Sequence, residues 1–191
     1  MKKIIIAALV LTSGITLTSS AQAQQVYLAG TVGESFWNAN CSGTTSCSTH
    51  DNDYKAILGY NFNSHWGIEA SYFSLGQLTA NLNEINGTIK ATGVDLGGVF
   101  RTGFTENWGL FAKLGVSDNR ANITANEITV GSNSVMTKKA ELFAAFGVTY
   151  SITPDFAFRA DVDTRKVEVD ANHLKSSGNV TSLNVGAQVT F

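Results

Sequence analysis

The segment FAFRADVDTR, residues 156–165, decides how the rest of the chain is interpreted. The two-residue period of a β-strand separates its side chains into an apolar face and an ionic face. Phe156, Phe158, Ala160, Val162 and Thr164 lie on the first face, and Arg159, Asp161, Asp163 and Arg165 lie on the second. In a soluble sheet the ionic face would meet water. In an outer-membrane barrel the apolar face meets lipid and the charges point into the lumen.

The first 23 residues have the pattern of a secretory signal peptide. Lys2 and Lys3 precede an apolar run over residues 4–10, and Ala21-Gln22-Ala23 has the small-x-small pattern that signal peptidases cleave. We therefore expect a signal peptide over residues 1–23 and one mature domain over residues 24–191. A short N-terminal anchor is the alternative, but the apolar run is shorter than the roughly 20 residues that a transmembrane helix needs.

The composition favours strands over helices and excludes some partners. Eighteen Gly and one Pro among 191 residues fit strands joined by turns. A net charge of −2 gives no indication of a nucleic-acid partner. No His, Cys, Asp and Glu spacing in the sequence predicts a metal site, so we expect neither a metal nor another cofactor.

Eight alternating runs follow one another along the mature chain. They lie near residues 25–35, 53–62, 66–76, 89–103, 108–118, 139–151, 155–167 and 179–191. The connections at 63–65, 105–107 and 152–154 are tight, whereas the segments 36–52, 77–88, 119–138 and 168–178 are long and polar. This pattern predicts an all-β, eight-stranded antiparallel up-and-down transmembrane barrel with short periplasmic turns and four long external loops.

The face that contains Arg159 predicts the lining of the lumen. When this face is followed through the tight turns, it collects five basic and five acidic residues: Lys55, Glu69, Asp95, Arg101, Lys113, Glu141, Arg159, Asp161, Asp163 and Arg165. Eight strands leave only enough room for side chains to fill the interior, and buried charges need opposite partners. We expect a salt-bridged, mostly closed lumen, with a gated water path as the alternative.

Alternation alone also fits a soluble calyx that holds a greasy ligand. The aromatic residues favour the membrane interpretation, because they fall on the apolar face beside the short turns. A girdle at one membrane interface is predicted from Tyr60, Phe62, Trp66, Phe104, Trp108, Tyr150, Phe156 and Phe191, with Tyr54 and Tyr72 toward the other end.

Two blocks of the sequence resemble the OmpA-type transmembrane domain. Residues 59–63 (GYNFN), 67–72 (GIEASY) and 75–76 (LG) are similar to its second and third strands, and residues 146–154 (FGVTYSITP), continuing to Arg159, are similar to its sixth turn and seventh strand. The resemblance implies a protein of the bacterial outer membrane that displays its loops outside the cell. It also implies that Phe191, at the end of an alternating run, is the signal for the barrel-insertion machinery.

The resemblance has departures as well. We expect the protein to have no periplasmic domain like that of full-length OmpA proteins, and in this it resembles small stand-alone barrels of the OmpX/Ail type. The family has two cross-strand ion pairs in its lumen. Glu69 and Arg159 match one pair, but Val99 and Thr149 occupy the positions of the other. We therefore expect a simpler central plug. We also expect the protein to be a monomer.

The remaining chemically reactive side chains, those of cysteine and histidine, lie in loops and turns. Cys41 and Cys47 are the only cysteines, and in an exported protein we expect a loop disulfide near Phe36 and Trp37. These two aromatic residues are expected either at the outer interface or in a contact surface. His50, His65 and His173 lie in polar segments without a positioned nucleophile, so we expect no catalytic residues.

Three functions are compatible with these observations. The first is an outer-membrane protein embedded in lipid that contacts a host or envelope partner through its loops, in an adhesion-like or structural role. The second is a small porin-like pore. The third is a soluble periplasmic barrel that binds a lipophilic ligand. A barrel in the membrane should resist SDS until it is heated, whereas a periplasmic binder should appear in the soluble fraction.

Overall fold

The computed structural model of the protein describes residues 26–38, 46–82, 85–127, 131–171 and 174–191. These residues form nine strands: β1 (Val26–Trp37), β2 (Ser46–Ser48), β3 (His50–Asn61), β4 (Trp66–Leu82), β5 (Ile85–Gly103), β6 (Trp108–Glu127), β7 (Gly131–Ser151), β8 (Phe156–Ala171) and β9 (Leu174–Thr190). Among them there is no helix of the length and apolar character needed to cross a bilayer. The signal peptide predicted for residues 1–23 lies outside the described residues.

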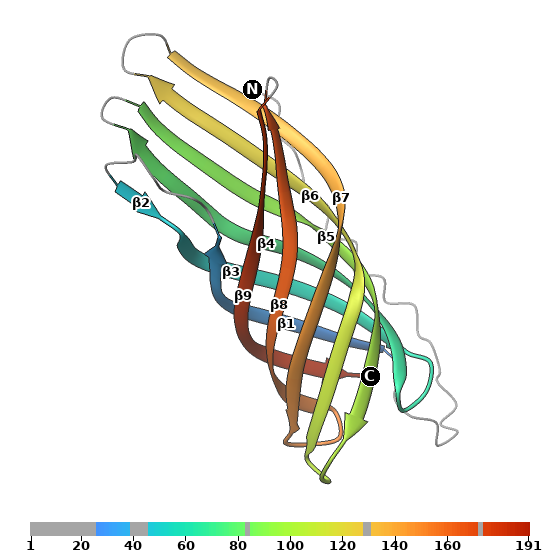
Figure 1. Cartoon of the computed structure of the whole chain (residues 1–191). Coiled ribbons are helices and arrows are strands. Elements are labelled where there is room, and N and C mark those ends of the chain that lie inside the picture. The colour runs from blue at the N-terminus through green and yellow to red at the C-terminus, as the bar shows by residue number, and fades with distance from the viewer. Residues whose placement is uncertain (1–25, 39–45, 83–84, 128–130, 172–173) are drawn as a thin grey trace, which may run out of the picture.

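Eight of the strands close into a barrel (Figure 1). From β3 to β9 each strand pairs antiparallel with the next, and β1 pairs with both β3 and β9. For example, Val32 of β1 lies opposite Tyr54 of β3 on one side and opposite Val185 of β9 on the other, so β1 joins the two ends of the ring. The prediction of an eight-stranded up-and-down barrel is confirmed.

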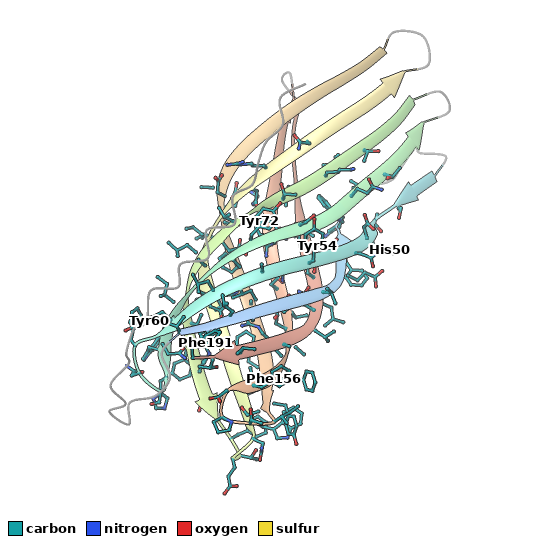
Figure 2. The ribbon with its side chains drawn as sticks, turned by 180° about the vertical axis from the view of Figure 1, so that it is seen from behind. His50, Tyr54, Tyr60, Tyr72, Phe156 and Phe191 are labelled. Carbon is teal, nitrogen blue, oxygen red and sulfur yellow. The ribbon has the colours of Figure 1, made fainter. Side chains whose placement is uncertain are left out.

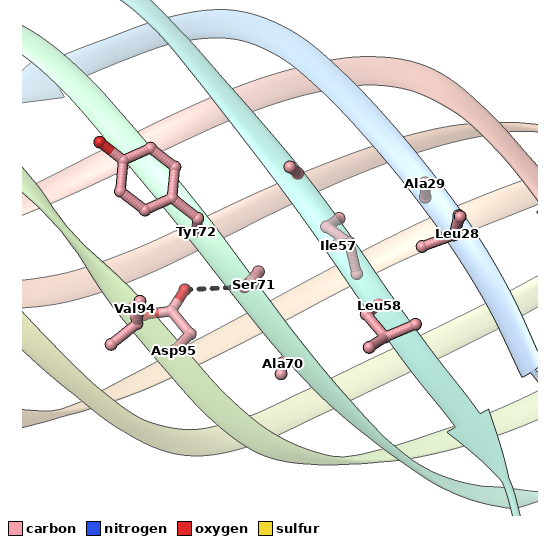
Figure 3. Close-up of a pocket in the computed structure, with 10 residues that line it drawn as sticks. Leu28, Ala29, Ile57, Leu58, Ala70, Ser71, Tyr72, Val94 and Asp95 are labelled. Atoms are coloured by element: carbon pink, nitrogen blue, oxygen red, sulfur yellow. Dashed lines mark hydrogen bonds between the residues drawn. The ribbon is translucent and has the colours of Figure 1, made fainter. Parts of the chain in front are cut away.

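The side chains alternate between the lumen and the outside, as the sequence predicts. Leu142 is 75% exposed on the outer surface, and the next residue, Phe143, is buried in the lumen. Figure 3 shows the same alternation across β3 and β4, where Leu58 and Tyr72 are exposed while Ile57 and Ser71 are buried. The apolar face therefore surrounds the barrel and the polar face fills it.

The three tight turns share one hydrogen-bond pattern. In each, a side-chain oxygen accepts a hydrogen bond from the backbone N–H three residues later. Asn63 Oδ1 accepts from Trp66, Thr105 Oγ1 from Trp108, and Thr153 Oγ1 from Phe156, at 2.9, 3.0 and 3.1 Å. Such side-chain bonds favour turns over continued strands. Each turn therefore ends at an aromatic residue that begins the next strand.

At the opposite end the strands are much longer than predicted. β4 runs to Leu82 and β5 starts at Ile85, and the hairpins β6–β7 and β8–β9 are similarly extended. The predicted long loops at 77–88, 119–138 and 168–178 are therefore mostly strand. Outside the membrane both faces of a strand meet water, so apolar alternation ends although backbone pairing continues.

The first outer segment also differs from the expected long loop. β2 pairs with the outer part of β4, with Cys47 opposite Ala80. The pairing of β4 with β3 ends at Ser74 and its pairing with β2 begins at Thr79. Between these points the pairing of β4 with β5 has a register shift, from Ser74 to Gln77. Gly76 lies in this shift with a φ of 68°, a conformation that residues with a Cβ rarely adopt.

Candidate functional site

The charged residues predicted for the lumen come from β3 to β8. Eight are buried inside the barrel: Lys55, Glu69, Asp95, Lys113, Arg159, Asp161, Asp163 and Arg165. Arg101 lies nearer the tight turns and keeps 19% of its side chain exposed. Glu141 is half-buried. All share the inward phase of their strands, which explains their common location.

Glu69 on β4 is the centre of the site. Its carboxylate accepts hydrogen bonds from Lys113 Nζ at 2.8 Å, from Arg101 Nη2 at 2.9 Å and from Arg159 Nη1 at 3.0 Å. The hydroxyl of Tyr27 also donates to Glu69 Oε1, at 2.6 Å. Because β4 and β8 lie on opposite sides of the ring, the contact between Glu69 and Arg159 spans the lumen.

The ion pairs continue from Arg159 along the lumen. Arg159 Nε lies 3.2 Å from Asp161 Oδ1. Lys55 Nζ lies 3.6 Å from Asp161 Oδ2 and also binds Asp163. One ammonium group from β3 therefore joins two carboxylates of β8.

Arg165 extends the network to β5. Its guanidinium contacts Asp163 at 2.6 Å and Asp95 at 3.0 Å. Ser71 donates to Asp95 at 3.3 Å, as Figure 3 shows. A continuous set of five cations and four carboxylates, from Arg101 to Asp95, thus fills this part of the lumen; we call it the lumenal charge network. Extensive pairing offsets much of the cost of burying these charges.

Aromatic rings support the cations of the network. The Arg165 guanidinium lies 3.8 Å from the ring centre of Phe73, and that of Arg159 lies 4.2 Å from Phe111. Arg101 similarly covers Tyr27 at 4.5 Å. Such contacts attract a cation to the ring face and fix its position. Each of these three arginines is therefore held by an aromatic ring as well as by carboxylates.

The sequence prediction omitted several of these residues. Tyr27, Phe73, Phe111 and Phe143 face the lumen, and none of them is among the aromatic residues predicted for the girdle. Their inward orientation could have been predicted from the sequence, because each occupies an inward-facing position in the alternation of its strand. The buried carboxylate of Asp53 was also omitted, although it shares the phase of Lys55.

The plug around Glu69 is larger than the simpler one expected. Val99 is fully buried and uncharged, as the sequence shows, but Lys113 lies opposite it in the β5–β6 register. Lys113 reaches Glu69 and adds a cation there. Glu141, by contrast, makes no ion pair with the other described residues.

A layer of apolar side chains lies farther from the tight turns than the network. This outer apolar layer consists of Trp37, Phe73, Leu75, Leu78, Ala91, Val167 and Val180. Both alternatives for Phe36 and Trp37, the outer interface and a contact surface, are wrong for Trp37. Phe36 is exposed, whereas alternation turns Trp37 into the barrel. The lumen therefore has a charged section and an apolar section in series.

The predicted aromatic girdle surrounds the end with the tight turns. Tyr60, Phe62, Trp66, Phe104, Trp108, Tyr150 and Phe191 are exposed, and Phe156 is half-buried. Figure 2 shows Tyr60, Phe156 and Phe191 near this end and Tyr54 and Tyr72 farther along the barrel. Neighbouring rings contact one another, for example Trp108 and Tyr150 at 4.9 Å between centroids. This distribution fits a membrane interface.

The other predicted features are only partly within the described structure. Cys41 and the side chain of Cys47 lie outside the described residues, and so does His173. His65 is exposed in a tight turn, and His50 lies 4.0 Å from Glu34 on the outer surface. Within the described ranges, no three His, Cys, Asp or Glu residues form a group that could hold a metal ion.

An eight-stranded barrel with an apolar exterior, an aromatic girdle and a charged interior defines a class, the outer-membrane β-barrel proteins. This protein is one of them, and its location is the bacterial outer membrane. It belongs to the family of the OmpA-like transmembrane domain, whose model matches residues 21–191.

Curated relatives support this assignment. The chain is 29% identical to outer membrane protein A of Shigella flexneri over 198 residues, which cover 100% of the chain and 56% of that protein. It thus spans about half the length of the OmpA relatives it matches. An uncharacterized protein of Haemophilus influenzae is 24% identical over 100% of the chain and 99% of its own length.

Solved structures show the same fold at low sequence identity. Neisserial surface protein A has a TM-score of 0.63 at 12% identity, covering 87% of this chain and 97% of its own. OprG of Pseudomonas aeruginosa has a TM-score of 0.58 at 15% identity, covering 89% and 97%. Ail of Yersinia pestis, in complex with the heparin analogue sucrose octasulfate, has a TM-score of 0.54 at 20% identity, covering 87% and 99%.

Proposed function

We propose that the protein is a non-catalytic surface-interaction protein, which binds an external partner through the outer parts of β5, β6 and β7. The observation that carries this proposal is an open sheet edge. The pairing of β6 with β7 extends to Glu127 and Gly131, whereas the pairing of β7 with β8 ends at Phe143 and Arg165. In Figure 1 the outer part of β7 diverges from β8 and β9.

The edge of β7 is suited to binding another extended chain. Among the described residues, 131–142 pair only with β6, so the other side of this segment presents unpaired backbone groups. Exposed strand edges are templates for the addition of a partner strand. A barrel that served only to occupy the membrane would not need this segment.

The charge of the outer sheet favours an anionic partner. Arg120 is exposed and lies directly opposite Lys138 in the register, and Lys90 is exposed on the neighbouring strand. Exposed Arg and Lys side chains on adjacent strands, here Arg120 and Lys90, attract anionic groups. Ail, which has the same fold, binds a sulfated heparin analogue in its solved structure.

The test is to shorten the β6–β7 hairpin while the barrel is retained. Replacing residues 122–136 with Asn-Gly leaves Ala121 opposite Thr137 and supplies residues that favour a two-residue hairpin. Cells that display the intact protein should adhere to heparin-coated surfaces and to epithelial cells, and cells with the shortened variant should lose most of this adhesion.

The controls separate binding from assembly. Both proteins should show the same heat-dependent mobility shift in SDS gels, since the membrane-spanning strands are unchanged. The double substitution Lys90→Ala and Arg120→Ala keeps the edge and should lower adhesion to heparin only. Equal adhesion by the intact and the shortened protein would contradict the proposal.

A further inference from the structure

A pocket lies in the barrel wall at the point where β7 and β8 separate (Figure 1). The last pair between these strands joins Phe143 to Arg165. Beyond it, among the described residues, 166–171 of β8 pair only with β9. The pocket has a volume of about 280 Å³ and is lined by residues of β6, β7, β8 and β9, with Phe143 and Arg165 among them. We call it the β7–β8 pocket.

The two sides of the β7–β8 pocket differ in polarity. On the side of β6 and β7, Leu114 and Leu142 point outward and are 71% and 75% exposed. On the side of β8 and β9, the lining includes the exposed residues Thr164, Lys166 and Asn179. One pocket therefore has an apolar wall and a polar wall that carries a cation.

The β7–β8 pocket lies at a border of the apolar outer surface. Along β8 the outward residues change from Val162 to Thr164 and Lys166, and along β9 they change from Leu183 to Thr181. The aromatic girdle surrounds the opposite border, beside the tight turns. Since the tight turns of such barrels face the periplasm, the pocket lies at the outer membrane interface. Lipid headgroups of the outer leaflet meet the barrel at this depth.

A buried donor without a partner belongs to the lining of the same pocket. Arg165 is 2% exposed, and its two Nη groups bind Asp163 and Asp95. Its Nε–H has no hydrogen-bond partner among the described residues. Nε is the guanidinium nitrogen nearest the strand, on a residue that lines the pocket. Buried donors nearly always have an acceptor, so a ligand with acceptor oxygens suits this position.

We propose that the β7–β8 pocket binds the phosphorylated headgroup of an outer-leaflet glycolipid of the lipid A class, with an acyl chain against its apolar wall. Among the described residues that line the pocket, Arg165 and Lys166 are cations and none is a carboxylate. Charged hydrogen bonds from Lys and Arg are strong contacts for phosphate. Leu114 and Leu142 favour a lipid over free phosphate, and the outer interface favours a glycolipid over an inner-leaflet phospholipid.

This lipid site is separate from the surface proposed for adhesion. It lies between β7 and β8, whereas the basic residues of that surface, Lys90 and Arg120, lie on β5 and β6. Loss of adhesion and loss of lipid binding are therefore independent results.

Native mass spectrometry tests the binding with the whole protein in detergent, where no charged membrane surface attracts lipid. The protein is titrated with diphosphoryl lipid A, with dephosphorylated lipid A and with phosphatidylglycerol. We expect a saturable one-to-one adduct with diphosphoryl lipid A and weaker binding of the other two lipids. Lys166→Gln should weaken the binding of diphosphoryl lipid A about fivefold, and Lys166→Arg should retain it, because only the first change removes the charge.

Two alanine positions supply a matched control for the apolar wall. Ala144→Phe places a ring in the pocket and should prevent the adduct. Ala112→Phe makes the same change at an exposed position of β6 outside the pocket lining and should leave the adduct unchanged. Both variants should keep the heat-dependent mobility shift in SDS gels, which reports a folded barrel. Equal binding by the intact protein and Lys166→Gln, or binding that does not saturate, would overturn the proposal. Equal affinity for phosphatidylglycerol would overturn the choice of a glycolipid.

Discussion

At the scale of single residues, the carboxylate of Glu69 carries more contacts than the ion pair with Arg159 alone would require. Three cations and the Tyr27 hydroxyl bind it. Arg159, in contrast, pairs with two carboxylates, Glu69 and Asp161. Removing the Glu69 carboxylate therefore takes one partner from each of three cations. Removing Arg159 leaves Glu69 paired with two cations, Lys113 and Arg101.

This asymmetry leads to a prediction for Glu69→Gln and Arg159→Ala. Loss of one partner of a buried pair costs about 3–5 kcal/mol, and lumenal water lowers that cost. We expect Glu69→Gln to lower the unfolding free energy more than Arg159→Ala, when both are measured in urea with lipid vesicles. The double variant should be close to Glu69→Gln, because Lys113 and Arg101 still lack an acid. A larger loss in Arg159→Ala would contradict the role of Glu69 as the centre.

The aromatic supports of the network give a second prediction. Phe73 is fully buried under the Arg165 guanidinium. Phe73→Leu keeps most of the apolar volume but removes the ring face, so we expect a loss of about 1–3 kcal/mol from packing and from the cation–π contact. Phe104→Leu, at an exposed position, is the control and should change the urea midpoint little.

At the scale of elements, Gly76 determines where β4 leaves β3 and joins β2. A Cβ at this position would lie 2.6 Å from the Asn52 carbonyl oxygen, and its φ of 68° adds strain. We expect Gly76→Ala to cost about 1–2 kcal/mol and to weaken the outer part of β4 while the barrel persists.

Hydrogen exchange in vesicles measures this effect. Amide protection should fall in β2 and in residues 77–82, and remain unchanged in the inner halves of β3 and β4. Gly98→Ala is a suitable control, because no atom lies within 4 Å of the added Cβ. Equal exchange in both variants would show that the register shift does not depend on Gly76.

Sequence periodicity predicts the strands only where one face meets lipid and the other meets the lumen, because the two faces then need side chains of different polarity. Leu142 and Phe143 have opposite environments, so this part of β7 is recognisable from the sequence. Thr124 and Ser134 are paired across β6 and β7, yet both are polar and carry no periodic signal. The inner strands were therefore predictable, whereas their outer extensions were not.

The candidate site was predictable to a similar degree. The inward phase identified Glu69 and Arg159, and the family resemblance indicated that they pair. The same phase could not show that Lys113 and Arg101 also reach Glu69. Long side chains cross the lumen to strands that are not neighbours, and periodicity contains no information about which partner they meet.

At the scale of the whole molecule, the lumen contains two sections of different chemistry, which we expect to close it together. The lumenal charge network fills the section nearer the tight turns, and the outer apolar layer follows it. Apolar constrictions block ions because water leaves them. Disruption of the charges alone should therefore not open a path.

Planar-bilayer conductance tests this expectation. The double variant Glu69→Gln and Arg159→Ala should conduct little more than the intact protein. Adding Trp37→Ser and Leu75→Ser should raise conductance clearly, since both closures are then weakened. High conductance in the first variant would mean that the apolar layer is not a barrier, and would favour the pore function.

The contact between the two ends of the barrel wall has a consequence for chain topology. The Phe191 N–H donates to the Val26 carbonyl at 2.8 Å, and Tyr27 lies opposite Thr190. The seam between β1 and β9 is thus paired like every other pair of strands, and the ring has no structurally distinct first strand. A circular permutant that joins Phe191 to Val26 by a short linker, and opens between Ala171 and Leu174, would retain every strand pairing of the barrel. The order in which the strands emerge from the ribosome is therefore a property of the gene rather than a requirement of the finished ring.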